Sequence, residues 1–160
     1  MRRTVGWIAG GDRDADDFIQ LSLVEILRSA GSFRGESSLE TWADRISVRT
    51  SRHAMRKRRD RSMVVVAEPR DDDQSGDDDP ARRLLQRDVA RALAQVPLQR
   101  RVPLVLKLVY QYSVAEIAEM TETRENTVRD RLQVGRRELR KAALRDPALR
   151  SYVASWGVER

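Results

Sequence analysis

Apolar residues recur three and four positions apart along most of the chain, which is the spacing of helices with one buried face. Turn residues and polar runs interrupt this pattern. The segments that follow it are residues 4–9, 14–29, 37–56, 81–95, 99–111, 113–120, 124–140 and 147–156. The pattern therefore predicts an all-α protein.

Residues 113–140 have the clearest organisation. Ser113 and Glu116 are spaced as a capping box, in which the hydroxyl accepts from a backbone N–H of the first turn and the carboxylate accepts from the N–H of Ser113. A polar run over residues 121–123 then interrupts the apolar period before a second helix begins near Arg124. The segment predicts a helix-turn-helix.

The second of these helices has two unlike faces. Its apolar face holds Val128, Leu132, Gly135 and Leu139, and its polar face holds Asn126, Arg129, Asp130, Gln133, Arg137 and Arg140. Such polar side chains can form hydrogen bonds with base edges in the DNA major groove. The alternative is a charged face that only contacts solvent.

The first half of the chain predicts a small helical bundle. Residues 14–29 begin with acidic side chains and carry apolar residues on more than one face, which predicts a helix buried between neighbours. Ser37 and Glu40 are spaced as a second capping box, and Leu39, Trp42, Ala43, Ile46 and Thr50 form the expected core stripe of the following helix. This helix ends in a basic run, residues 52–61, which is either a solvated helix end or a phosphate-binding edge.

A change in composition predicts the domain boundary. A short apolar run at residues 63–67 is followed by the sequence DDDQSGDDDP, residues 71–80, which has the composition of a flexible segment. We predict a first domain at residues 1–61, an acidic linker at 62–80, a second domain at 81–145 and a C-terminal extension at 146–160. The linker is either solubilising or a nucleic-acid mimic. The extension, opened by Asp146 and Pro147, is expected to pack on the second domain, with docking on a partner as the alternative.

Charge and residue usage limit the possible functions. The 160 residues carry a net charge of +6, which is consistent with a polyanionic partner. The absence of cysteine excludes disulfides and thiolate metal sites, and the single histidine, His53, leaves little basis for a histidine metal site or catalytic triad. No apolar run reaches the roughly 20 residues that span a bilayer, and no signal-peptide core is present. We therefore expect a cytoplasmic protein without cofactor, metal or membrane insertion.

Motifs in both halves together resemble the extracytoplasmic-function (ECF) group of bacterial RNA polymerase sigma factors. In the first half the matching stretches are residues 14–20, 33–42 and 45–46. In the second half they are Val96, Pro97, Arg101, residues 113–118, 127–129, 131–132 and Arg136. The resemblance covers nearly the whole chain, and the order and spacing of the motifs are specific.

The resemblance implies two DNA-binding surfaces, a polymerase-binding surface and no catalysis. The expected upstream-element residues are Ser113, Arg124, Asn126, Thr127, Arg129, Asp130, Arg131, Gln133, Arg136 and Arg137. The expected downstream-element residues are Phe33, Arg34, Gly35, Glu36, Ser37, Ser38, Trp42, Arg45, Arg49, Arg52 and Arg56. Asp16, Asp17 and Gln20 are expected to bind core RNA polymerase, and an anti-sigma factor is an expected further partner.

Some positions depart from the pattern of the family. Gln111, Glu122 and Asn126 stand where the family commonly carries Gly or a small turn residue, so the turns are expected to differ. Arg49 stands where Asn is usual, and Asp130 and Val134 replace frequent Ser and Arg, which predicts an unusual promoter preference. Two alternatives remain: a two-domain DNA-binding regulator that does not bind polymerase, and a sigma-like decoy that does not initiate transcription.

Overall fold

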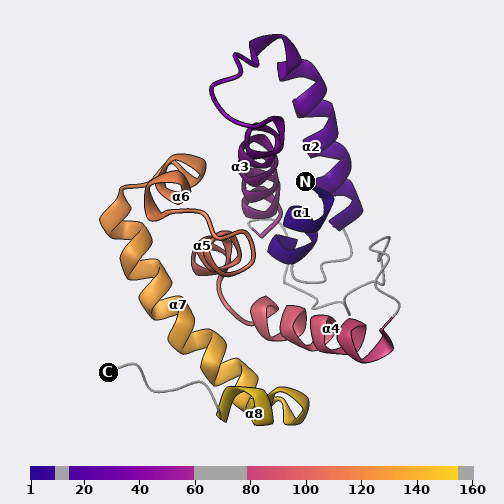
Figure 1. Ribbon diagram of the computed structural model, residues 1–160, viewed down its shortest axis with the longest axis vertical. Helices are drawn as coiled ribbons and strands as arrows, with labels where there is room; N and C mark the ends of the chain where they lie inside the picture. Colours follow the sequence, from indigo (N-terminus) through magenta and orange to yellow (C-terminus); the bar gives the residue numbers. More distant parts are fainter. Residues whose placement is uncertain (10–14, 60–78, 155–160) are drawn as a thin grey trace.

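The computed structural model describes residues 1–9, 15–59 and 79–154 of the chain. Over these ranges the chain forms eight α-helices and one 3₁₀ helix, and none of the described residues lies in a strand (Figure 1). The elements are α1 (Arg2–Ala9), α2 (Ala15–Ser29), η1 (Ala30–Ser32), α3 (Leu39–Arg59), α4 (Pro80–Ala94), α5 (Leu98–Leu108), α6 (Val114–Thr121), α7 (Glu125–Arg145) and α8 (Pro147–Ala154). The all-α prediction is confirmed. The linker predicted at residues 62–80 lies outside the described residues except for its last two.

Helices α2 and α3 pack side by side in the first domain, and α1 contacts both. Small hydroxyl side chains line this contact. The Ser22 hydroxyl donates to the Phe18 carbonyl oxygen at 2.7 Å and lies 3.4 Å from the Ser51 hydroxyl, and the Ser47 hydroxyl donates to the Ala43 carbonyl oxygen at 2.7 Å. These bonds satisfy the buried hydroxyls without bulky partners, so the helices can approach closely.

The predicted core stripe of α3 is wrong. Leu39 is 62% exposed, and the buried residues of the helix are Asp44, Ser47, Val48 and Ser51. The shift arises because α3 contacts α1, α2 and α6. The predicted capping box at Ser37 is also wrong: the hydroxyl of Ser38 accepts from the Thr41 N–H at 3.1 Å, so the helix begins one residue later than expected.

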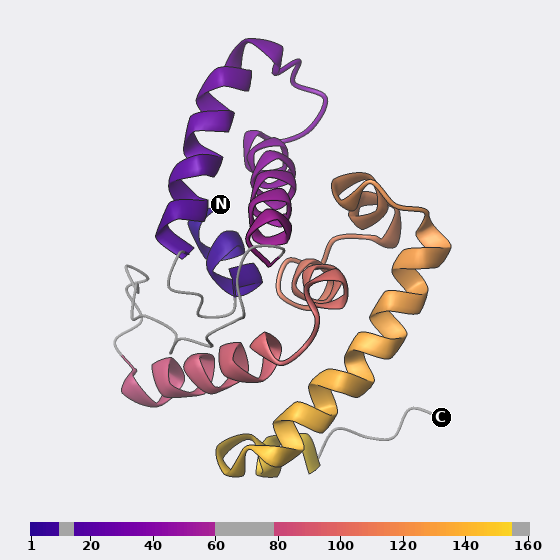
Figure 2. The same ribbon diagram turned by 180° about the vertical axis from the view of Figure 1, so that it is seen from behind.

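The predicted burial of α2 between neighbours is wrong as well. Phe18 and Ile19 are buried, but four large apolar side chains are exposed: Leu21, Leu23, Val24 and Leu27. In Figures 1 and 2, α2 lies at the outer edge of the molecule and has helices on one side only. The second apolar face therefore meets solvent.

In the second domain, α5 and α7 cross, and α8 folds back against α7 and α4 (Figure 1). Leu149 and Val153 of α8 are buried, which confirms that the predicted extension packs on this domain. Asp146 caps α8 by accepting from the Ala148 N–H at 3.0 Å, as expected. Asp79 caps α4 in the same way, with Pro80 at the first helical position.

Helix α5 is shorter than the predicted 99–111. It covers Leu98–Leu108, and the buried Pro103 lies in its second turn. The chain then turns at Gln111, whose φ of 58° is left-handed. This tight turn brings the chain from α5 into the first residues of α6.

The two domains share one apolar core. Ile8 of α1 and Val48 of α3 are fully buried in the same cluster as Leu93, Leu104 and Met120 of the second domain. The Arg101 guanidinium donates to the carbonyl oxygens of Ile8 and Ala9 at the end of α1, both at 3.1 Å. The domains are therefore packed together rather than only joined by a linker.

Candidate nucleic-acid interface

Helix α6 begins with the capping box predicted from the sequence. The Glu116 N–H donates to the Ser113 hydroxyl at 3.2 Å, and the Ser113 N–H donates to the Glu116 carboxylate at 2.7 Å. The hydrogen bonds from Ser113 lower the pKa of Glu116. This carboxylate therefore stabilises the folded state at pH values above its ordinary pKa, and the contribution is lost as the pH falls through the lowered value.

The turn between α6 and α7 has a left-handed residue at its first position. Glu122 has a φ of 52° and a ψ of 45°, and it ends α6. The Thr123 N–H then donates to the Ala118 carbonyl oxygen at 2.9 Å. This is the conformation that Gly usually supplies, and here a Glu adopts it. Gln111 is left-handed as well, and the expected difference from the turns of the family stays a prediction.

The two faces of α7 are as the sequence predicts. Val128, Leu132, Gly135 and Leu139 are buried. Most of the predicted upstream-element residues are exposed, and these are Ser113, Arg124, Asn126, Arg129, Asp130, Gln133, Arg136 and Arg137. Thr127 and Arg131 are half-buried. One continuous face of the helix-turn-helix thus presents polar and cationic groups to solvent.

Arg129 is held by two neighbours on the same helix. Its Nη1 donates to the Asn126 Oδ1 at 2.9 Å, and its Nη2 donates to the Glu125 Oε2 at 2.6 Å. These contacts orient the guanidinium along the exposed face of α7. Glu125 was not among the predicted site residues, although its position four residues before Arg129 is the sequence signal for this pair.

Contacts with α5 fix the position of α7. Arg100 forms a two-bond ion pair with Glu138, with both N–O distances at 2.7 Å. Gly135 lies where the helices cross, because a Cβ there would lie 3.0 Å from the Leu104 side chain. The exposed face of α7 is therefore carried on a rigid support.

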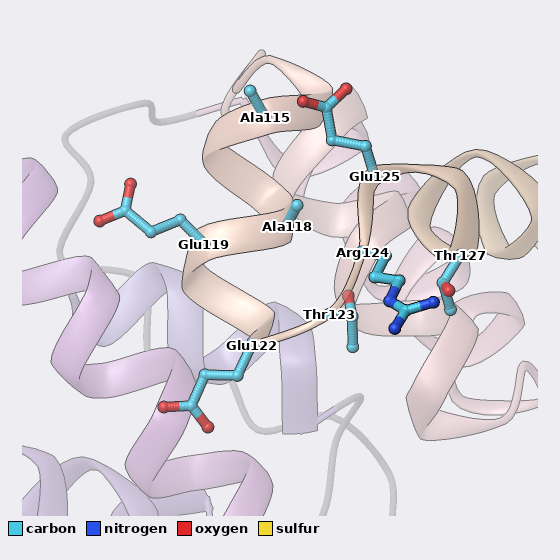
Figure 3. A pocket seen from close by; sticks show the side chains of 8 residues that line it. All are labelled: Ala115, Ala118, Glu119, Glu122, Thr123, Arg124, Glu125 and Thr127. Carbon is cyan, nitrogen blue, oxygen red and sulfur yellow. The ribbon is translucent and has the colours of Figure 1, made fainter.

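An open hollow follows α6 and the start of α7 (Figure 3). It is lined by Ala115, Ala118, Glu119, Glu122, Thr123, Arg124, Glu125 and Thr127. Glu119 and Glu122 extend from α6 on the side of α3, and Arg124 lies across from them (Figure 3). Within the described ranges, no cluster of histidine and acidic residues is suited to hold a metal ion.

The predicted downstream-element residues lie on the loop before α3 and along α3. Phe33 and Trp42 contact each other, with ring centroids 5.3 Å apart and ring planes at 56°. Gly35, between them in the chain, has a φ of 74°. Arg34, Gly35, Glu36 and Ser38 are exposed and Ser37 is half-buried. The loop and the first turn of α3 thus bring together an aromatic pair, with Trp42 half-buried, and several exposed polar groups.

Arg45, Arg49 and Arg52 of α3 contact the second domain instead of solvent alone. The Arg45 Nη1 lies 2.7 Å from the Glu119 Oε1, and the Arg49 Nε lies 3.3 Å from the Glu122 Oε1. The Arg52 Nη1 donates to the Thr121 carbonyl oxygen at 2.5 Å. Arg56 is exposed. Sequence reasoning did not single out Glu119 or Glu122 as partners of this face, because the pairing joins helices far apart in the chain.

The predicted polymerase-binding residues lie together near the start of α2. Asp16, Asp17 and Gln20 are all exposed. The exposed apolar residues Leu21, Val24 and Leu27 continue along the same helix. These apolar residues were not predicted as functional, and the signal for them is that α2 has more apolar positions than one buried face requires. None of the helices, over the described residues, is long and apolar enough to cross a membrane.

Comparisons with known families match both halves of the chain. Residues 1–61 match the Sigma-70 region 2 family, and residues 86–139 match the Sigma-70, region 4 family. A solved structure of the sigma factor RpoE in complex with the anti-sigma factor NepR from Bartonella quintana has a similar fold. Its TM-score is 0.69, with 20% identity and 88% of each chain covered.

Curated relatives support the same grouping. The chain is 30% identical to the RNA polymerase sigma-H factor of Pseudomonas aeruginosa over 141 residues, covering 81% of this chain and 73% of that protein. It is 31% identical to the ECF RNA polymerase sigma factor SigM of Mycobacterium tuberculosis over 126 residues, covering 79% of this chain. That match spans 62% of the length of SigM.

Proposed function

The chain belongs to the sigma-70 family of RNA polymerase sigma factors, in its ECF group, and we propose that it binds core RNA polymerase and directs transcription initiation. In this proposal residues 1–61 bind the polymerase and the downstream promoter element, and residues 81–145 bind the upstream element. The acidic linker at 62–80 joins these domains, and the extension at 146–160 supports the second.

The exposed polar face of α7 is the observation that carries the proposal. It holds Arg129, Gln133 and Arg136 opposite the buried Val128 and Leu132. A helix of this kind enters the major groove, where arginine and glutamine side chains can form paired hydrogen bonds with bases. The apolar face fixes the helix to the protein and leaves the polar face for DNA.

The first domain supplies a second DNA surface of different chemistry. The Phe33 and Trp42 rings offer faces on which unpaired bases stack, and the arginines of α3 supply positive charge for the DNA backbone. In the same proposal Asp16, Asp17 and Gln20 on α2 bind core polymerase, together with the exposed Leu21 and Val24.

The remaining parts of the proposal concern partners and location. Because the similar RpoE structure contains the anti-sigma factor NepR, we propose that an anti-sigma factor also regulates this chain. The protein acts in the cytoplasm with the polymerase, needs no cofactor and catalyses no reaction itself. Its mechanism is differential binding: contacts formed only with separated strands favour the open promoter.

Reconstitution with purified core RNA polymerase tests this function. The protein is added to core polymerase with fragments of the source genome, and transcripts are mapped by their 5′ ends. We expect discrete start sites that appear only when both components are present. Binding to DNA without binding to core polymerase would instead identify a DNA-binding regulator, and core binding without transcripts would identify a decoy.

A further inference from the structure

Asp130 is an exposed carboxylate on the polar face of α7, which lies along the outer edge of the second domain (Figures 1 and 2). Its neighbours on that face are neutral or cationic, and these are Asn126, Arg129, Gln133 and Arg137. We propose that Asp130 determines promoter specificity: it accepts a hydrogen bond from the N4 amino group of one cytosine in the upstream element and rejects guanine and thymine at that position. This inference rests on the proposed function, because it assigns the polar face of α7 to DNA.

Asp130 differs from the other acidic residues of α6 and α7, because no described residue pairs with it. The other acidic side chains of these two helices each have a hydrogen-bond or ion-pair partner, and these are Glu116, Glu119, Glu122, Glu125 and Glu138. An acidic residue on a helix pairs with cations three or four positions away. At those positions from Asp130 the helix has no positive charge, since they hold Asn126, Thr127, Gln133 and Val134. The carboxylate is therefore available to a partner outside the protein.

The stability of α7 does not explain the carboxylate either. A negative charge in the first turn of a helix interacts favourably with the helix dipole, but this effect falls off within that turn. Helix α7 begins at Glu125, so Asp130 lies beyond its first turn. In a helix interior, Asp is one of the poorer helix-forming residues. We therefore look for the role of Asp130 in DNA binding.

A carboxylate on a DNA-binding face lowers affinity for DNA in general. The phosphates on both sides of the groove repel its charge, whereas they attract Arg129 and Arg137 on the same face. A neutral side chain at position 130 would bind DNA of any sequence more tightly. Specificity, however, is a difference between affinities, and a group that weakens binding to the wrong sequences increases that difference. Asp130 is placed to act in this way.

The chemistry of the carboxylate identifies the base. An ionised carboxylate only accepts hydrogen bonds. In the major groove cytosine presents a single polar group, the N4 amino donor, and adenine presents the N6 amino donor beside the N7 acceptor. Guanine and thymine present acceptors, which repel a carboxylate. We therefore expect cytosine to be preferred opposite Asp130, adenine to be second, and guanine and thymine to be rejected.

The second-best base distinguishes this contact from one made by Arg129. A guanidinium would read the guanine paired with the cytosine, through its N7 and O6 atoms. Replacing that guanine by adenine keeps N7, so the second-best base on the cytosine strand would be thymine. A contact with Asp130 instead makes adenine the second-best base on that strand, because adenine keeps an amino group there. The two contacts therefore predict different base orders at the same pair.

Selection from random DNA tests the proposal. Duplexes with a randomised segment are bound by the full-length protein, alone and with core RNA polymerase, and the bound fraction is sequenced. Asp130→Ala removes the carboxylate, and Asp130→Asn keeps its size but adds an N–H donor. Glu25→Ala, at an exposed position of α2, removes the same charge away from α7 and is the matched control. Circular dichroism checks that each variant is folded.

We expect the parent and Glu25→Ala to select the same bases, with one position at which cytosine is preferred and adenine is second. Asp130→Ala is expected to lower the preference for cytosine over guanine and thymine at that position by at least about fivefold. It is also expected to bind unselected DNA more tightly than the parent, because a repulsive charge is lost. Asp130→Asn is expected to accept guanine and thymine there, since its amide can donate to their O6 and O4 atoms.

The outcomes separate this inference from the proposed function. If the Asp130 variants select the same bases as the parent, or if thymine is second-best at the affected position, Asp130 does not read this base and the inference is wrong. Specific initiation by the parent with core polymerase would in that case leave the sigma function standing. If the cytosine preference depends on Asp130 but the protein does not bind core polymerase, the inference is supported and the sigma function is wrong. A parent protein that selects no sequence, alone or with core polymerase, would contradict both.

Discussion

Arg129 is the best-oriented candidate for reading a base. Its guanidinium is fixed by Asn126 and Glu125 and points from the exposed face near the start of α7. We predict that Arg129→Ala lowers discrimination at one upstream base pair by about 1–3 kcal/mol. Competition binding of holoenzyme to promoters substituted at single positions measures this loss.

Arg129→Lys separates base reading from charge. Lysine keeps the positive charge but cannot form the paired hydrogen bonds of a guanidinium. If Arg129 contacts only a phosphate, Lys restores binding and the Ala variant loses affinity equally on every sequence. Either observation would remove Arg129 from the base-reading residues.

Gln111 adopts a backbone conformation that favours Gly. Its φ of 58° is left-handed, and its side chain is exposed. We predict that Gln111→Gly raises the free energy of unfolding by about 0.5–1 kcal/mol, since relief of left-handed strain outweighs the added freedom of the unfolded chain. Urea unfolding followed by circular dichroism measures the change.

Arg140→Gly is the control for this substitution. Arg140 is exposed and lies in helical conformation within α7, where Gly lowers stability by about 1 kcal/mol. The two Gly variants are therefore expected to change the free energy of unfolding in opposite directions. A loss of stability at both positions would show that Gln111 is not strained.

At the scale of elements, the crossing of α5 and α7 depends on a residue without a side chain. A Cβ at Gly135 would lie 3.0 Å from Leu104, which is fully buried and has little room to move. At Gly6 in α1 a Cβ meets nothing within 4 Å. Ala has a higher helix propensity than Gly at both positions, so the two sites differ only in their surroundings.

We predict that Gly6→Ala raises the free energy of unfolding by up to about 1 kcal/mol, through helix propensity alone. The free energy of unfolding of Gly135→Ala is expected to be at least about 1 kcal/mol lower than that of Gly6→Ala, because the added methyl group crowds Leu104. Thermal and urea unfolding of both variants give the difference. An equal rise in the free energy of unfolding for Gly6→Ala and Gly135→Ala would show that α5 and α7 can move apart without cost.

Local signals in the sequence predicted most helices. The pair Ser113 and Glu116 fixed the start of α6, and the apolar period from Val128 to Leu139 fixed the buried face of α7. Asp79 and Pro80 form the same signal as Asp146 and Pro147, but their place in an acidic run led to their assignment to the linker. Capping and periodicity involve neighbouring residues, so one sequence is enough to detect them.

Features that depend on packing between distant helices were not predictable in this way. Nothing near α3 in the sequence indicates that Asp44 is buried, because its partners are Thr4 of α1 and Tyr112 of the other domain. The exposure of Leu21 and Leu27 likewise depends on which side of α2 the other helices occupy. The candidate site followed the same rule: the exposed face of α7 was predicted, and the pairing of α3 with Glu119 and Glu122 was not.

At the scale of the whole molecule, Tyr112 reports on the contact between the domains. Burial and the adjacent negative charge of Asp44 raise the pKa of Tyr112 to about 12. An unfolded tyrosine titrates near pH 10. The folded state therefore keeps its proton at higher pH, so the stability from this group is complete below about pH 10 and is lost as the pH rises toward 12.

Absorbance at 295 nm during an alkaline titration measures this effect. We predict that Tyr112 of the folded chain ionises near pH 12 and that Tyr112→Phe removes its share of the late absorbance change. Burial also raises the pKa of Tyr110, so the rest of the late change belongs to that residue. In urea all tyrosines of the parent are expected to ionise near pH 10. A Tyr112→Phe variant whose late absorbance change is as large as that of the parent would show that Tyr112 does not ionise in this range.

The basic end of α3 is predicted to contact phosphates without reading sequence. Arg56 and Lys57 are exposed there, and the side chains of the remaining basic run, residues 58–61, lie outside the described part of the chain. We predict that Arg56→Ala with Lys57→Ala lowers the slope of log binding constant against log salt by about 1.5, from two lost phosphate contacts. Lys141→Ala with Arg145→Ala, at the far end of α7, is the matched control. An unchanged slope in the Arg56→Ala, Lys57→Ala variant would show that this end of α3 contacts no phosphate.

Arg101 connects the backbones of the two halves of the chain. Besides holding the end of α1, its guanidinium donates to the carbonyl oxygens of Ala94, the last residue of α4, and of Val96, two residues beyond it. Four backbone acceptors from both domains thus depend on one side chain of α5. All four acceptors are backbone carbonyls, so the joint depends on the position of the two chain segments and on this one guanidinium, and not on the side chains around it. Losing the guanidinium would remove one donor from both halves of the chain at once.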